Sequence, residues 1–140
     1  YKIKKDGHSG GGANRIYNFR IIVGINNKGR GIAKYPFLSL KVNEPYKISE
    51  YGVDGNYNFG LPRIVKSFEI DSYTSFGANN DIVIHSNNAL EVVYIKGNIH
   101  SSFENISPLK IDYKICAEDI KMIEGTKTIA PSEYIKILNL

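Results

Sequence analysis

The chain has 140 residues, a net charge of +4 and one cysteine, Cys116. Hydrophobic residues make up 42% and charged residues 23%, which indicates a single globular domain and argues against disorder. No apolar run approaches the roughly 18 residues of a membrane-spanning helix, so no membrane association is expected. The lone cysteine excludes an internal disulfide. Together with the lack of a signal region after Tyr1, it favours a cytoplasmic domain taken from a longer protein.

The first segment, residues 1–14, is expected to be a flexible linker. Three consecutive glycines, Gly10 to Gly12, end a polar stretch, and such a composition is typical of linkers. A phosphate-binding loop is excluded, because Ala13 and Asn14 stand where such a loop needs a lysine and a hydroxyl residue.

From residue 15 to residue 130, apolar and polar residues alternate with a period of two, which predicts β-strands. The longer predicted strands are Tyr17 to Ile25, Ala33 to Val42, Ile64 to Ile70, Leu90 to Lys96 and Leu109 to Ala117. Shorter strands are expected over 73–76, 82–84 and 126–130. Between the longer ones, Pro36 indicates an edge or a bulge, because proline cannot donate to a ladder.

Two further expectations concern the end of one strand and a short helical segment. Gly97 and Asn98 are expected to end the strand before them, and residues 118–124 to form one helical turn. Residues 131–140 are expected to be a tail or the start of a next element.

The number and spacing of these strands predict an all-β fold with seven or eight strands over residues 15–130. We expect an antiparallel two-sheet sandwich with immunoglobulin-like architecture. The chain has no tryptophan and only one cysteine, so an antibody-type domain is not expected.

No catalytic or metal-binding motif is found. The histidines His8, His85 and His100 are scattered along the chain, and with one cysteine they do not supply the close ligand spacing of a zinc site. No nucleophile, base and orienting partner can be assembled from sequence motifs. We therefore expect neither enzymatic activity nor a cofactor.

The candidate binding residues are aromatic and basic. The glycine- and asparagine-rich segment 51–62 carries Tyr51, Tyr57 and Phe59, and Arg63 follows it. Lys28 and Arg30 lie in a second turn-rich segment, 26–31. Aromatic rings beside cations can stack on bases or sugars. The alternative is that these tyrosines, with the nearby Tyr46, plug one end of the fold.

The charge is uneven along the chain. Residues 1–70 hold 12 Lys and Arg against 5 Asp and Glu, which gives +7, and residues 71–140 hold 6 against 9, which gives −3. A basic first half is suited to phosphate backbones or to an acidic partner.

Three stretches carry a family resemblance: NNKGRGIAKYPFLSLKV (26–42), YKISEYGVDGNYNFGLPR (46–63) and PLKIDYKICAEDIKMIEGTKTI (108–129). They resemble the region after the nucleotide-binding part of bacterial AlbA-type, Schlafen-like DNA-binding proteins, which are also described as divergent ATPases or transcriptional regulators. The resemblance implies an accessory β-domain in a parent protein that binds nucleic acid or nucleotide through another domain. It supplies no catalytic residue.

The leading hypothesis is a non-catalytic accessory domain that contacts neighbouring domains of its parent protein, self-associates as a homo-oligomer, or recognises a partner. One alternative is direct nucleic-acid binding through a basic, tyrosine-rich face. Another is an extracellular module that binds carbohydrate or protein.

Overall fold

The computed structural model describes residues 1–50, 60–64, 72–77, 81–100, 102 and 106–138. This part of the chain forms eleven strands and one α-helix, α1 (Pro131–Leu138). All strand pairs are antiparallel, so the prediction of an all-β, antiparallel fold is confirmed. Five of the eleven strands have only two or three residues, which is why their number exceeds the seven or eight predicted.

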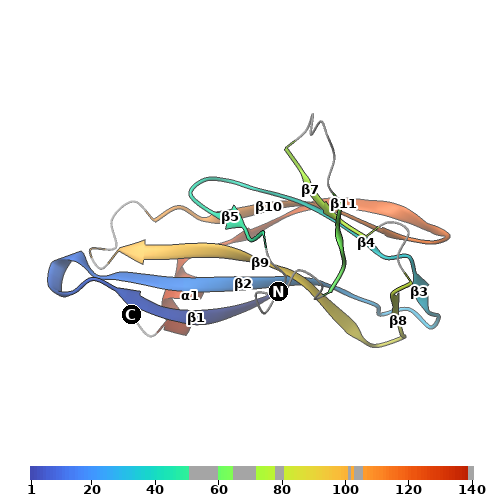
Figure 1. Ribbon diagram of the computed structural model, residues 1–140, viewed down its shortest axis with the longest axis horizontal. Coiled ribbons are helices and arrows are strands. Elements are labelled where there is room, and N and C mark those ends of the chain that lie inside the picture. The colour runs from blue at the N-terminus through green and yellow to red at the C-terminus, as the bar shows by residue number, and fades with distance from the viewer. Residues whose placement is uncertain (51–59, 65–71, 78–80, 101, 103–105, 139–140) are drawn as a thin grey trace.

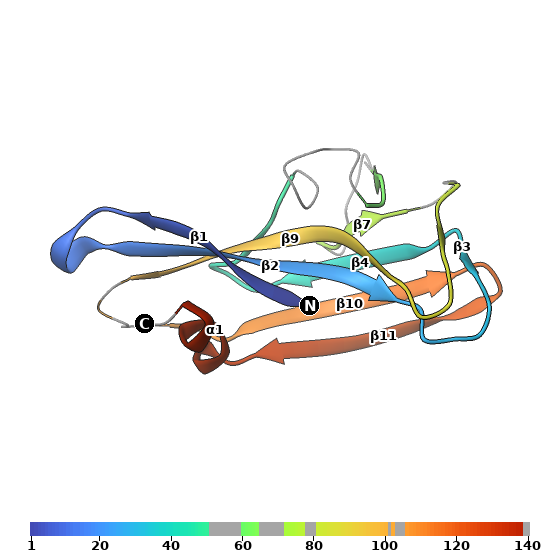
Figure 2. The same cartoon turned by 90° about the horizontal axis from the view of Figure 1, so that it is seen from below.

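Two larger sheets and one small sheet make up the fold (Figure 1). The first sheet has the order β1 (Lys2–Ser9), β2 (Ile16–Asn26), β9 (Ala89–His100) and β5 (Lys47–Ile48). The second has the order β11 (Ile120–Ile129), β10 (Leu109–Ala117), β4 (Phe37–Val42), β7 (Thr74–Phe76) and β6 (Arg63–Ile64). The small sheet pairs β3 (Ala33–Lys34) with β8 (Val83–Ile84). The long strands run along the longest axis of the molecule (Figure 2).

The core lies between the two larger sheets. One isoleucine from each strand of the first sheet stands directly opposite the next and faces the core: Ile3, Ile21, Ile95 and Ile48. The second sheet meets them with apolar side chains from β4, β10 and β11, which include Leu40, Leu109 and Ile129. We call the four residues of the first sheet, Ile3, Ile21, Ile95 and Ile48, the isoleucine row.

The N-terminal segment is a strand, and the expectation of a linker over residues 1–14 is wrong. β1 pairs with β2 from Lys2 to Ser9, and Ile3 packs against the core. Gly10 has a φ of +73°, and a Cβ there would lie 2.5 Å from the Asn14 carbonyl oxygen. The glycines therefore allow a tight hairpin turn. β1 has only one core-facing apolar residue, so its alternation is weak in the sequence.

Strand β9 continues past the predicted end at Gly97 and Asn98, as far as His100. Gly97 stays inside the strand because the Phe19 ring packs against its backbone. A Cβ at Gly97 would lie 2.4 Å from Phe19 Cζ. Here glycine provides space for a core ring and does not end the strand.

The C-terminal third also differs from expectation. The predicted helical turn over residues 118–124 is instead a two-residue turn followed by β11, which pairs with β10 along its length. Asp119 adopts a φ of 60° in that turn, a conformation that aspartate tolerates better than most residues. Residues 131–140, expected to be a tail or the start of a next element, contain α1, whose Tyr134 is fully buried and stacks on Phe19 with ring centroids 4.8 Å apart.

Other predicted elements agree with the structure. β2, β7 and β10 occupy the predicted positions, and the predicted strand 33–42 divides at Pro36 into β3 and β4. Only Ile64 of the predicted strand 64–70 lies in a described strand, because residues 65–70 are outside the described part of the chain.

Candidate functional site

The predicted binding residues fall on separate parts of the fold. Lys28 and Arg30 are exposed in the loop between β2 and β3, and Arg63 is exposed at the start of β6, at the edge of the second sheet. Tyr51, Tyr57 and Phe59 lie outside the described residues. Among the three described residues, Lys28, Arg30 and Arg63, the structure shows no contact that joins the loop to β6.

The loop that carries Lys28 and Arg30 is held by Asn27. The Asn27 amide nitrogen donates to the carbonyl oxygens of Gly31 (2.9 Å) and Ile84 (2.8 Å), and Asn27 Oδ1 accepts from the Gly29 amide at 3.0 Å. Asn27 therefore fixes the loop to the small sheet, and both basic side chains project from an ordered backbone.

A different set of cations is brought together on the outer face of the first sheet. The register places one basic residue of each strand directly opposite the next: Lys4, Arg20, Lys96 and Lys47. Opposed residues in antiparallel strands share a face, and each of these adjoins a member of the core-facing isoleucine row. The four side chains therefore form a row on the outside, about 14 Å long at the usual spacing of strands. We call it the cation row.

Sequence reasoning missed the cation row because its members are up to 92 residues apart, from Lys4 to Lys96. A weak signal is present: each cation adjoins an isoleucine, as in Ile3–Lys4, Arg20–Ile21, Lys47–Ile48 and Ile95–Lys96. Such pairs identify strands with one core face and one basic face, but only the strand register brings the basic residues together.

Among the residues that the structure describes, few carboxylates pair with the cation row. Arg20 Nε lies 2.7 Å from Asp6 Oδ1, and the Arg20 guanidinium lies 5.4 Å from the centroid of the Tyr94 ring. Within the described ranges, neither Lys4, Lys47 nor Lys96 forms an ion pair. Like charges directly opposite each other destabilise a sheet, so the cations of the row repel one another in the folded chain.

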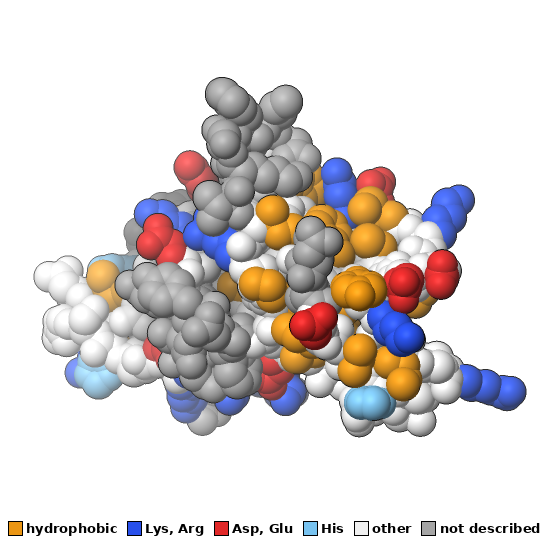
Figure 3. Space-filling view, turned by 45° about the vertical axis from the view of Figure 1, so that its right-hand side comes forward, with side chains coloured by type: hydrophobic (Ala, Val, Ile, Leu, Met, Phe, Trp, Pro, Cys, Tyr) orange, Lys and Arg blue, Asp and Glu red, His pale blue; other side chains and the backbone are white. Residues whose placement is uncertain are grey.

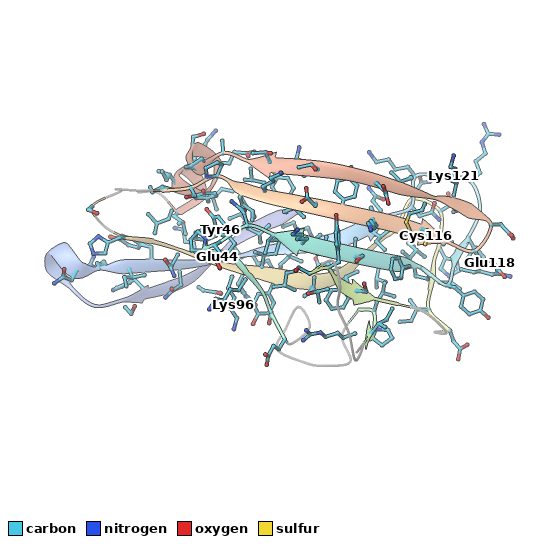
Figure 4. All side chains as sticks on the ribbon, turned by 90° about the horizontal axis from the view of Figure 1, so that it is seen from above. Glu44, Tyr46, Lys96, Cys116, Glu118 and Lys121 are labelled. Carbon is cyan, nitrogen blue, oxygen red and sulfur yellow. The ribbon has the colours of Figure 1, made fainter. Side chains whose placement is uncertain are left out.

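An open groove of about 1000 Å³ adjoins the row. Lys47, Lys96 and Tyr94 line it, together with the side-chain amides of Asn18 and Asn98, which stand opposite each other on β2 and β9. Two carboxylates, Asp6 and Glu44, also line the groove. Figure 4 shows Glu44, Tyr46 and Lys96 near one another, far from Cys116, Glu118 and Lys121 at the other end of the molecule.

Two buried tyrosines join the groove to the core. The hydroxyls of Tyr46 and Tyr134 are 2.6 Å apart, and each lies within hydrogen-bond distance of the Ser107 carbonyl oxygen, at 2.5 and 2.6 Å. Burial is the main reason why the pKa of both tyrosines is raised above the ordinary value of 10.0. They stay neutral at physiological pH and have a structural role. Tyr46 is thus buried at this end of the core, while Tyr51, Tyr57 and Phe59, for which the same role is the alternative, lie outside the described residues.

The opposite end of the two larger sheets is incompletely covered. β1 begins at Lys2, opposite Ile22, so the stretch from Val23 to Asn26 in β2 has a described ladder partner only on its β9 side. Two cavities of about 180 and 120 Å³ lie along this stretch, and both are lined by Ile115 of β10. We call this region, with Ile120 and Ile123 of β11, the apolar slot.

Large apolar side chains are exposed around the slot. Ile120, Met122 and Ile123 of β11 are 50%, 43% and 56% exposed. Ile32, Tyr35 and Val83, in or beside the small sheet, are exposed as well. The small sheet contacts the β10–β11 turn, where the Glu118 amide donates a hydrogen bond to the Lys34 carbonyl oxygen. Figure 3 shows that hydrophobic side chains gather over one face of the molecule. A contiguous exposed apolar surface is typical of an interaction site.

Other kinds of site find little support in the described residues. No group of three or more His, Cys, Asp or Glu side chains there could hold a metal ion. Cys116 is a free, half-buried thiol that lines the smaller cavity of the slot. No helix among these residues is long and apolar enough to cross a membrane.

Comparison with family models, with curated proteins and with solved structures finds no match to this chain. The resemblance to AlbA-type, Schlafen-like proteins therefore stays a prediction, and the function must be argued from the two surfaces.

Proposed function

We propose that this chain is a non-catalytic, immunoglobulin-like β-sandwich domain that docks a partner segment within a larger, cytoplasmic, bacterial DNA-binding or ATP-binding regulatory protein. The two larger antiparallel sheets and their shared core support the architecture. The resemblance of residues 26–42, 46–63 and 108–129 supports the parent protein. The observation that carries the docking function is the apolar slot.

The partner in this proposal is an extended segment that adds to β2 as a strand. It runs antiparallel to β2 along Val23–Asn26, in line with β1. The start of β1 shows how such a segment is received: Ile3 packs against the core, and Tyr1 lines the larger cavity of the slot. Every second side chain of the partner points to the core side of the sheet, as Tyr1 and Ile3 do. These side chains are apolar and enter the two cavities.

Burial of apolar surface drives this docking. The partner covers Ile115 and Ile123, and its own alternate side chains leave water as they enter the cavities. Each aliphatic side chain that becomes fully buried contributes about 1.5–3 kcal/mol. The added strand also pairs with backbone groups of β2, which sets its register and direction.

A designed extension tests the slot without knowledge of the natural partner. The tetrapeptide Val-Thr-Val-Thr placed directly before Tyr1 puts both valines in phase with Tyr1 and Ile3. We expect it to raise the free energy of unfolding by about 2 kcal/mol, since two valines become largely buried. We also expect it to slow amide hydrogen exchange in Val23–Asn26.

The matched control is Thr-Val-Thr-Val, which has the same composition but places the valines on the outer face. We expect it to leave the stability and the amide exchange close to those of the unmodified chain. If the two extensions behave alike in both measurements, strand addition at the slot is wrong.

A further inference from the structure

We propose that the cation row is a binding site for the phosphate backbone of single-stranded nucleic acid. This site lies on the outer face of the first sheet and is independent of the apolar slot. Its residues, Lys4, Arg20, Lys47 and Lys96, differ from the basic residues that the sequence indicated.

The first argument is the arrangement of charge. Three successive cross-strand pairs, Lys4–Arg20, Arg20–Lys96 and Lys96–Lys47, oppose like charges across all four strands of the first sheet. Each pair is unfavourable in the isolated domain. The adjacent isoleucine row fixes the register, so the cations cannot move apart along the strands. A polyanion lying along the row relieves the repulsion in all three pairs at once.

The second argument is that the carboxylates of the described residues pair with little of the row. In the parts of the chain that the structure describes, Asp6 is the only carboxylate paired with a member of the row, through Arg20. The neighbouring Lys2 has its own partner, Glu91, at 3.1 Å. Three of the four cations of the row are thus available to an external anion.

The third argument is what surrounds the row. The groove offers the amides of Asn18 and Asn98, which can donate to or accept from base edges, and the ring of Tyr94. Proteins that bind single strands combine a basic groove with polar and aromatic side chains in this way. The exposed carboxylate of Glu44 lies in the same groove and repels phosphate, so it weakens binding in the natural sequence.

The test is fluorescence anisotropy of the intact chain with a labelled oligothymidylate of about 12 nucleotides, a length within the usual site sizes. If three cations neutralise phosphates, log K falls with log of the salt concentration with a slope of about −2, at about 0.7 per phosphate. An affinity that does not change with salt contradicts the proposal.

The decisive comparison uses two variants with the same change in net charge. Lys47→Glu with Lys96→Glu reverses two members of the row, and Lys28→Glu with Arg30→Glu reverses two exposed cations of the β2–β3 loop. We expect the first variant to bind at least about tenfold more weakly, because it loses charge-assisted contacts and adds repulsion. We expect the second to change the affinity less than about threefold, since only long-range screened interactions differ. Circular dichroism shows whether each variant stays folded.

Further outcomes decide the site and the ligand. Equal weakening by both double variants means that net charge, and not the row, drives binding, and overturns the proposal. Glu44→Gln is expected to tighten binding, a result that a partly unfolded variant would not give.

Vesicles rich in phosphatidylserine are the alternative polyanionic surface. If they bind through Lys47 and Lys96 while oligothymidylate does not bind, the row is a membrane-surface site and the proposal is wrong.

Discussion

The two ends of the larger sheets differ in what covers them. At one end, α1 packs beside β1, and Tyr134 closes the core against Phe19 and Tyr46. At the other end, β2 extends beyond β1, and Ile115 and Ile123 line open cavities. Both ends are built from the same long strands, and α1 covers the core at the closed end. The closed end buries its aromatic rings, whereas Ile120, Met122 and Ile123 of β11 stay exposed at the open end, where we propose that a partner docks.

The largest effect is expected at the closed end, from Tyr134→Ala. Tyr134 is fully buried between Phe19 and Tyr46, so its loss leaves a cavity and removes a hydrogen bond. We expect the free energy of unfolding to fall by about 3–5 kcal/mol, measured by urea denaturation. Ile137→Ala on the same helix is the control, since Ile137 is 41% exposed, and a comparable loss from it would contradict the role of Tyr134.

A smaller effect is expected from pH. Burial raises the pKa of Tyr46 and Tyr134 in the folded chain above the unfolded value of 10.0, so the folded state holds these protons more tightly. The contribution of the two tyrosines to the free energy of unfolding is complete below about pH 10. It is lost as the pH rises from there through the pKa values of the folded chain. Tyr134→Phe is expected to cost about 1 kcal/mol near neutral pH through its lost hydrogen bond.

The measurement compares urea unfolding of the two proteins at about pH 8 and about pH 11, on either side of the tyrosine pKa. We expect the difference in stability between the natural chain and Tyr134→Phe to shrink at the higher pH, because the variant keeps only the Tyr46 hydroxyl and so loses one of the two tyrosines that ionise more readily in the unfolded chain. A difference that stays constant would show that Tyr134 does not contribute to the alkaline loss of stability.

The smallest effect on stability is expected at the open end. Ile123→Thr keeps a β-branched side chain at an exposed position, so the free energy of unfolding should change by less than about 0.5 kcal/mol. Binding of a hydrophobic dye should fall, because the slot loses apolar surface. Ile129→Thr on the same strand is the contrast: Ile129 is fully buried, and we expect a loss of about 2 kcal/mol or more. Similar losses from both variants would remove the distinction between the two ends.

The long central strands could be predicted because each buries one face against the core. Tyr17 to Ile25 and Leu109 to Ala117 carry enough alternating residues for the pattern to stand alone. β1 could not be predicted in this way, because only Ile3 faces the core and the rest of the strand is polar. Gly97 misled the prediction because a glycine that ends a strand and one that leaves space for Phe19 look alike in the sequence.

The candidate sites could be predicted even less. Lys28, Arg30 and Arg63 are candidates because they lie near aromatic or turn residues in the sequence, whereas charge gathers in space through strand register. The cation row depends on which residue stands opposite which, and a single sequence does not specify this. The apolar slot depends on how β2 packs across from β10 and β11, which the pattern of a single strand does not specify either.

The adjacency of the isoleucine row and the cation row has a consequence for folding. If any strand of the first sheet paired one residue out of step, its isoleucine would turn to water and its lysine or arginine would enter the core. Burying one unpaired charge costs several kcal/mol, so every misaligned pairing is rejected on both faces at once. The same basic side chains that we propose hold phosphate thus also act as a check on correct strand alignment.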